Sequence, residues 1–332
     1  MAEAGTTTID EAGSTRGRVA RARFASLAQK HGALIVLVLV CIFGFARYET
    51  FLTQENLMNI LRQNSMVGLI ALGMTFVILT GGIDLSVGSL YAVASVVAVY
   101  LAGYGLVAAL LGAVAVTAVL GLINGLVITK ARIQPFIVTL AMMIAARGLA
   151  LAVTDEKSVS ADRAAPATFG WLAHGYIGPL PVPVVLLFVA FAVGWLVLNH
   201  TRFGRHVYSV GDNEEAARLM GLNVERVTIY VYALSGALAG LAGVIFASRL
   251  KTGQPSAGIG WELDAISAVV VGGTLLTGGQ GGVGSTLVGV LLLGVIINIL
   301  PREGITSWWQ LVVRGVILLA VVIVQSRLSK KK

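Results

Sequence analysis

Residues 85–129 read LSVGSLYAVASVVAVYLAGYGLVAALLGAVAVTAVLGLINGLVIT, and this stretch contains no charged side chain. A helix needs about 20 apolar residues to cross the ~30 Å hydrocarbon core of a bilayer. The stretch is therefore long enough for two membrane-spanning helices and the turn between them. A chain that contains it is predicted to be a membrane protein.

Apolar segments continue on both sides of this stretch. They lie at residues 32–46, 63–83, 133–153, 183–201, 227–248, 265–301 and 305–326. The 265–301 segment is long enough for two passes and is interrupted by glycines. The sequence therefore predicts an all-α, polytopic membrane protein with about ten transmembrane helices of roughly 20 residues each.

The composition agrees with this fold class. Apolar residues make up 57% of the 332 positions and charged residues 12%, whereas a typical soluble domain has about 25% charged residues. The single cysteine, Cys41, excludes an internal disulfide and a cysteine metal cluster. The four histidines are scattered without a ligand spacing, so no metal site and no bound cofactor are predicted.

The positions of lysine and arginine orient the chain. With the N-terminus in the cytoplasm, the inner segments hold about twice as many of these residues as the outer ones, as the positive-inside rule requires. An even number of spans then places both termini in the cytoplasm. The predicted parts are a cytoplasmic tail (1–32), a transmembrane domain (33–326) with an outer loop (154–182) and a cytoplasmic loop (200–226), and a basic cytoplasmic tail (327–332).

The segment TGGIDLSVGS (80–89) joins two of the predicted spans and carries one charge, Asp84. Its glycines favour irregular backbone, which is tolerated at membrane depth only where protein or a water-filled cavity surrounds it. An ionisable residue in such a place indicates a functional site. The alternative is that Asp84 caps a helix that begins near Ser86. Both interpretations stay open, and they are compatible.

A second glycine-rich break lies at residues 272–284, where TGG (277–279) and VGS (283–285) repeat elements of the first. Interrupted apolar segments in both halves of a transporter can mark its transport site. The string GQGGVGST (279–286) is similar to a phosphate-binding loop, but Ser285 stands where that loop needs lysine. The chain is therefore not predicted to bind ATP.

Few other polar residues lie inside the predicted spans. Asn124 and Asn298 either line a path or make interhelical hydrogen bonds, and the second interpretation is favoured. Glu262 and Asp264 are two residues apart, so on a helix they would point to different faces. No pair of carboxylates or of nucleophile and base stands out, and no enzymatic activity is predicted.

The cytoplasmic loop contains a predicted short helix, DNEEAARLMG (212–221). Asp212 or Asn213 can cap its first N–H groups, acidic residues fill its first turn, and Gly221 ends it. Its apolar face is small. From these residues alone, the helix is either a docking element or part of a plain loop.

Several segments in order resemble the ribose/xylose/arabinose-type permeases of ATP-binding-cassette (ABC) importers. These permeases are part of a superfamily of binding-protein-dependent permeases for sugars and branched-chain amino acids. The resemblance runs from about residue 33 to 328. The segments that carry it are FLTQENL (51–57), TGGIDLSVGS (80–89), GDNEEAARLMGLN (211–223), YALSGALAG (232–240) and WELDAISAVVVGG (261–273).

The resemblance implies an importer subunit of the bacterial inner membrane that translocates a monosaccharide. It implies a homodimer with the pathway between protomers, a separate cytoplasmic ATPase that uses ATP and Mg²⁺, and a periplasmic sugar-binding protein. It implies that residues 80–89, with Asp84 and Ser86, lie near the pathway, and Asn124 is kept as a further pathway candidate because it is polar and lies inside a predicted span. The residues implied in coupling to the ATPase are Gly211, Asp212, Asn213, Glu215, Ala216, Ala217, Gly221 and Asn223.

Two rival functions remain at this point. A permease of the same architecture can carry another small solute, such as a nucleoside or an amino acid, because selectivity would lie mostly in the binding protein. An ion-coupled secondary transporter, with Asp84 or Arg147 as the coupling charge, needs no ATPase and predicts uptake that collapses with the ion gradient.

Overall fold

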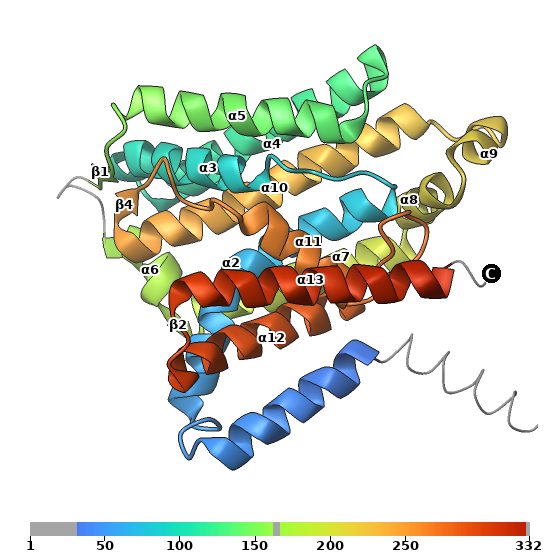
Figure 1. Ribbon diagram of the computed structural model, residues 1–332. Helices are drawn as coiled ribbons and strands as arrows, with labels where there is room; N and C mark the ends of the chain where they lie inside the picture. Colours follow the sequence, from blue (N-terminus) through green and yellow to red (C-terminus); the bar gives the residue numbers. More distant parts are fainter. Residues whose placement is uncertain (1–31, 162–166, 330–332) are drawn as a thin grey trace, which may run out of the picture.

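The computed structural model describes residues 32–161 and 167–329. Most of the predicted N-terminal tail, the end of the predicted basic tail and a short part of the predicted outer loop lie outside these ranges. Within them the chain is a bundle of long helices with two very short two-stranded sheets (Figure 1). The all-α class is confirmed.

The elements follow in a simple order along the chain. A first helix, Gly32–Arg47, precedes α2 (Gln54–Leu79). The following elements are α3 (Val87–Leu101), η1 (Ala102–Tyr104), α4 (Leu106–Ala131), α5 (Pro135–Val153), β1 (Val159–Ser160), α6 (Ala167–His174), β2 (Tyr176–Ile177), β3 (Leu180–Pro181), α7 (Val182–His200), α8 (Arg202–Asp212), α9 (Glu214–Leu219), α10 (Val224–Leu250), β4 (Thr252–Gly253), α11 (Trp261–Val271), α12 (Val283–Ile299), η2 (Leu300–Glu303) and α13 (Ser307–Ser329).

Among the described residues, seven helices are long and apolar enough to cross a membrane. They are α2, α3 with η1, α4, α5, α7, α10 and α12 with η2. The first helix and the Ser307–Ile323 part of α13 are apolar but shorter. The predicted 265–301 segment divides into α11 and α12, with the glycine-rich break between them. The chain is thus a polytopic membrane protein.

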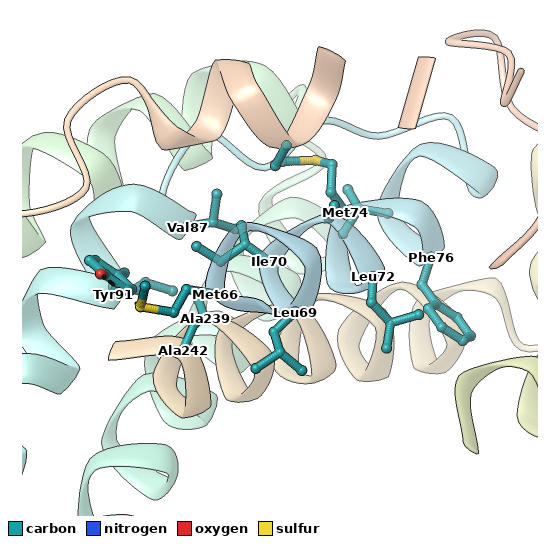
Figure 2. Packing of buried hydrophobic residues seen from close by; sticks show 14 of the residues in the cluster. Met66, Leu69, Ile70, Leu72, Met74, Phe76, Val87, Tyr91, Ala239 and Ala242 are labelled. Carbon is teal, nitrogen blue, oxygen red and sulfur yellow. Dashed lines mark hydrogen bonds between the residues drawn. The ribbon is translucent and has the colours of Figure 1, made fainter. Parts of the chain in front are cut away.

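The α2 helix lies at the centre of the bundle. Along its most apolar 18 residues, 72% are buried within the protein, whereas only 22% are buried along the corresponding parts of α4 and α5. Figure 2 shows how α2 packs on its neighbours: Ala239 and Ala242 of α10 lie beside it, and Tyr91 of α3 lies beside Met66. The α2 helix is therefore screened by its neighbours, and much of α4 and α5 is left for lipid or another chain.

Small residues let α4 and α10 approach closely. A Cβ on Gly121 or Gly236 would overlap the backbone of the other helix, at Tyr232 and Thr117 respectively. A Cβ on Gly125 would lie 2.6 Å from the Cα of Ile229. The four-residue spacing of small residues noted in lipid-embedded helices therefore serves here to pack α4 against α10.

The loops gather at two ends of the bundle (Figure 1). At one end β1 pairs with β4 and β2 with β3, and the Arg302 guanidinium donates to Thr50 Oγ1 at 3.0 Å. At the other end lie α8 and α9, and Lys130 forms an ion pair with Glu225. The described N- and C-terminal ends of the chain both lie at this second end (Figure 1).

Candidate transport site at two broken helices

The first break, residues 80–86, connects α2 to α3. The left-handed φ of 79° at Gly81 turns the chain out of α2, and a Cβ on Gly82 would lie 2.5 Å from the Tyr232 hydroxyl. Side chains from other helices donate hydrogen bonds to a backbone carbonyl group that has no helical partner here. The carbonyl oxygen of Ile83 accepts from Tyr232 at 3.3 Å and from Thr139 at 3.2 Å. Irregular backbone is therefore enclosed by protein, as apolar surroundings require.

Asp84 lies at the centre of this break and is fully buried. Its Oδ1 accepts from the backbone N–H of Ser86 at 3.0 Å and from the Ser86 hydroxyl at 2.5 Å. Its Oδ2 accepts from the Ser235 hydroxyl of α10 at 2.8 Å. The buried carboxylate thus has three donors, which is the condition for holding a charged or polar group away from water.

Asn124 of α4 completes the cluster. Its Nδ2 donates to the Ser86 hydroxyl at 3.0 Å, and its Oδ1 has no hydrogen-bond partner within the described ranges. The structure therefore brings together the three pathway residues expected from the sequence, Asp84, Ser86 and Asn124. All three are fully buried. We name Asp84, Ser86, Asn124 and Ser235 the Asp84 cluster.

The capping interpretation of Asp84 holds only in part. The α3 helix begins at Val87, and its N-cap residue, Ser86, makes no side-chain capping bond. The Asp84 carboxylate accepts the N–H of Ser86 itself, not those of the first helical turn. Ser235 was missed because nothing local marks a serine inside a helix as a partner. The only signal was its place in the 232–240 segment that carries the family resemblance.

The second break, residues 272–282, repeats part of the first. Gly278 has a φ of 87°, close to the 79° of Gly81, and α12 begins at Val283 as α3 begins at Val87. The hydroxyl of Ser285 donates to the Gly282 carbonyl at 2.8 Å. The hydroxyl of Ser89 donates to the Ser86 carbonyl at 2.7 Å in the same way. The short sequence echo therefore corresponds to a similar turn and helix start, although Gly279 has a positive φ of 73° and Gly82 does not.

The two breaks contact each other. The N–H of Gly279 donates to the carbonyl oxygen of Leu79, the last residue of α2, at 3.0 Å. Deeper in the bundle, the hydroxyls of Thr75 and Thr286 lie 2.8 Å apart and are fully buried. The interruptions in α2–α3 and in α11–α12 thus form one continuous region.

The short helix predicted within residues 212–221 exists and is capped as expected. It is α9, Glu214–Leu219, and Asn213 Oδ1 accepts the N–H of Ala216 at 2.9 Å. Asp212 belongs to the end of α8 instead, so of the two residues considered for the cap it is Asn213 that serves. Gly221 has a φ of 82°, a conformation that favours glycine, and it ends the helix segment.

The remaining residues of the expected coupling segment lie around this helix. Ala217 is buried against the bundle, Ala216 is partly buried, and Glu215 is exposed. Asn223 Oδ1 accepts the N–H of Arg226 and so caps α10. The large apolar side chains of Leu219 and Met220 are 85% and 69% exposed. These two apolar side chains therefore face outward where α9 ends.

The charged side chains inside the apolar segments bind neighbouring polar groups of the protein in this conformation. Arg147 of α5 donates to the carbonyl oxygens of Pro255 and Ala257 at 2.7 and 2.6 Å. Arg314 of α13 pairs with Asp264 of α11 at 2.9 Å. Asn298 donates to Asn56 across α12 and α2 at 3.1 Å, so the favoured interpretation of Asn298 as an interhelical contact is confirmed.

Comparison with known proteins decides the family. Residues 56–322 match the family described as "Branched-chain amino acid transport system / permease component". The chain belongs to this permease family. The match covers both breaks, the Asp84 cluster and α9. A comparison with solved structures returned no significant match.

Several permeases that are named for sugars are similar to the chain over nearly its full length. The ribose import permease protein of Escherichia coli (strain K12) is 43% identical over 306 residues, covering 91% of this chain and 95% of the relative. That of Bacillus subtilis (strain 168) is 44% identical over 311 residues, covering 93% and 96%. The xylose transport system permease protein of E. coli (strain K12) is 32% identical, covering 89% and 91%.

Proposed function

We propose that this chain is the membrane-spanning permease subunit of an ATP-driven importer that carries a monosaccharide across the bacterial inner membrane. The observation that carries the proposal is 43–44% identity, over more than nine-tenths of the chain, to proteins named ribose import permeases. Permeases named for allose and xylose are also similar. The bundle of apolar helices and the exposed α9 fit such a subunit.

The proposed topology has about ten transmembrane segments with both termini in the cytoplasm. The seven long helices, the first helix, α11 and α13 supply these segments. The end of the bundle that holds α8 and α9 faces the cytoplasm in this arrangement. Support comes from the chain ends at that same end and from the excess of lysine and arginine in the segments assigned to it.

Three partners follow from the proposal. A cytoplasmic ATPase subunit docks on α9, where Leu219 and Met220 offer apolar contacts beside the acidic residues Glu214 and Glu215. A periplasmic sugar-binding protein docks at the opposite end, and a second copy of the chain completes the pathway. The ATPase, not this chain, binds ATP and Mg²⁺, since no lysine-containing phosphate loop occurs in the sequence.

The mechanism we propose is alternating access. Closure of two ATPase subunits displaces α9 of each protomer. This rigid-body motion tilts the membrane-spanning helices, which open the pathway to one side and then to the other. A sugar is neutral and rich in hydroxyls, so the pathway needs passing polar contacts and no strong binding site. Asp84, Ser86 and Asn124 lie beside the pathway in this mechanism. The unused Oδ1 of Asn124 is an acceptor for a hydroxyl if the cluster opens.

The proposal is tested by transport. The protein is reconstituted in liposomes with a ribose-type ATPase and binding protein, and uptake of labelled pentoses and hexoses is measured with and without internal ATP. Uptake that needs both ATP and the binding protein supports the proposal. Uptake driven by a proton or sodium gradient without the ATPase overturns it. Preferential uptake of a nucleoside or an amino acid overturns the assigned substrate class.

Two variants test the coupling role of α9 in the same assay. Gly221→Trp and Ala217→Trp should abolish uptake while the protein stays folded, since both changes alter the surface around α9. Ala217 is buried against the bundle, so its replacement also displaces α9. Normal transport by both variants would contradict the docking of the ATPase on this helix.

A further inference from the structure

Three backbone segments meet at one point where α8 ends: residues 79–81, Gly211, and residues 278–279. We call the contacts among Leu79, Gly81, Gly211, Gly278 and Gly279 the glycine junction. A Cβ on Gly211 would overlap the Leu79 carbonyl oxygen and would lie 2.6 Å from the Gly279 nitrogen. A Cβ on Gly278 would lie 2.8 Å from the Gly81 nitrogen and 3.0 Å from the Gly211 oxygen.

These contacts are between main chains, with no side chain between them. A packed side chain can change rotamer and absorb a displacement, whereas a backbone in direct contact cannot. The hydrogen bond from Gly279 to Leu79 further holds the two breaks to each other at 3.0 Å. A shift of any one segment is therefore passed directly to the others.

Gly211 connects this junction to α9. It lies in the last turn of α8, two residues before Asn213, which caps α9. The path from the exposed surface of α9 to the junction is thus a continuous stretch of helix and cap. Leu79 ends α2, and Gly279 lies in the break before α12. One residue of the coupling segment therefore contacts both interrupted regions.

Tyr208, one turn earlier in α8, makes a second link to the same break. Its hydroxyl donates to the carbonyl oxygen of Gly281 at 2.9 Å. Burial raises the pKa of the Tyr208 phenol above its usual range, so the hydroxyl keeps its proton and remains a donor. The α8 helix therefore contacts the second break at two points on one face, Tyr208 and Gly211.

We propose that the glycine junction makes α8, α9 and the two breaks move as one body, and that Gly211 is the positioning residue of this coupling. The inference rests on the proposed docking of an ATPase at α9. Displacement of α9 then moves the ends of α2 and α12 at the same time. The Asp84 cluster, at the far end of the first break, is reached through residues 80–83 of the same segment.

A second route leads from α9 to the Asp84 cluster, and it predicts a different effect of Gly211 variants on uptake. The α9 helix also continues through Asn223 into α10, which carries Ser235 of the Asp84 cluster. If motion travelled only through α10, a methyl group at Gly211 would leave transport unaffected. The two routes are therefore separated by a substitution at Gly211.

The variant is Gly211→Ala in the full complex with ATPase and binding protein. The matched control is Gly148→Ala in α5, since Gly148 is also helical but has no heavy atom near the site of an added Cβ. Both changes favour the helix locally, because alanine has the higher helix propensity. Only the change at Gly211 forces the junction apart.

Three quantities are measured in parallel: recovery of the ATPase with the permease, ATP hydrolysis, and sugar uptake. We expect Gly211→Ala to keep the ATPase bound and hydrolysing ATP while uptake falls about tenfold or more relative to Gly148→Ala. Uptake by Gly211→Ala equal to that of Gly148→Ala would overturn the proposed coupling through the glycine junction. Absence of ATP-driven uptake in the unmodified complex would instead overturn the proposed function on which the inference rests.

A distance measurement keeps the inference testable if Gly211→Ala fails to fold. Spin labels at Glu215→Cys and Gln280→Cys, in a Cys41→Ala background, report on α9 and the second break, where both residues are exposed. Labelled protomers are diluted with unlabelled ones. We expect this distance to stay constant between nucleotide-free and ATP-bound complexes, while the distance from Glu215→Cys to a label at Lys157→Cys changes. A 215–280 distance that changes with ATP would overturn the single moving body.

Discussion

The hydroxyl of Ser235 donates a hydrogen bond to Asp84 Oδ2 over 2.8 Å, with both side chains fully buried. This contact joins the first break to α10. It lies next to α2, since a Cβ on Gly73 would come within 2.9 Å of the Ser235 Cα. A carboxylate in such a place is tolerated because three donors surround it, and its removal leaves each of them unpaired.

Asp84→Ala is therefore expected to lower both stability and uptake. Each buried donor left without its acceptor costs about 1–3 kcal/mol. The thermal midpoint in detergent, followed by tryptophan fluorescence, should fall clearly below that of the exposed control Glu55→Ala. Asp84→Asn keeps an acceptor oxygen and should lose less. Equal midpoints for Asp84→Ala and Glu55→Ala would show that the cluster does not hold the break.

The close approach of α4 and α10 gives a second prediction. Gly121→Leu places a side chain where the backbone of Tyr232 lies, so the two helices must separate or α4 must shift. Overpacking of this kind costs about 1–3 kcal/mol, and more where backbone is displaced. Gly148→Leu is the control, because that position faces open space. Expression in the membrane and the thermal midpoint should fall for Gly121→Leu alone.

The ion pair between Arg314 and Asp264 gives a third prediction. The two side chains are 28% and 18% exposed, so the loss of one partner leaves a mostly enclosed charge. Arg314→Ala and Asp264→Ala should each destabilise the protein, and the double variant should be less destabilised than the sum of the two. Additive losses of thermal stability would show that the pair contributes no coupling between α11 and α13.

The exposed pair on α9 gives a fourth prediction. Leu219→Asp removes an apolar contact and adds a charge beside Glu214 and Glu215, so recovery of the ATPase with the permease should fall about tenfold. The control is Tyr104→Asp, a similarly exposed position (82% against 85% for Leu219) in η1, between α3 and α4. Both variants should fold, because both side chains lie at the surface. Unchanged recovery with Leu219→Asp would place the ATPase elsewhere.

Much of the fold followed from local patterns. Uncharged stretches located the apolar helices because a span needs a fixed length of apolar residues. Their ends were less well placed: α2 begins at Gln54, with Thr53 as its cap, although the uncharged interval starts only at residue 63. Charged residues near a helix end interrupt the apolar pattern without ending the helix, so charge alone sets its boundary too late.

Three residues of the candidate site were predicted from the sequence, but the side chains of other helices that bond to the first break were not. Asp84, Ser86 and Asn124 were expected together, and they form one hydrogen-bonded group. Ser235 and Thr139 were not identified, because they lie on other helices and their local sequence does not distinguish them from packing serines and threonines. Pairing between distant segments depends on how the helices are placed, and periodicity within one segment does not record that.

The sequence by itself determined the membrane-spanning class, the two glycine-rich breaks and the short helix that begins after Asp212 or Asn213. These depend on span length, on the conformational freedom of glycine and on capping chemistry, all of which act over a few neighbouring residues. Only the tertiary structure decided that Gly81, Gly211 and Gly278 meet at one point, and that Asp84 bonds to Ser235. Those contacts join residues far apart in the chain, so they exist only once the helices have packed.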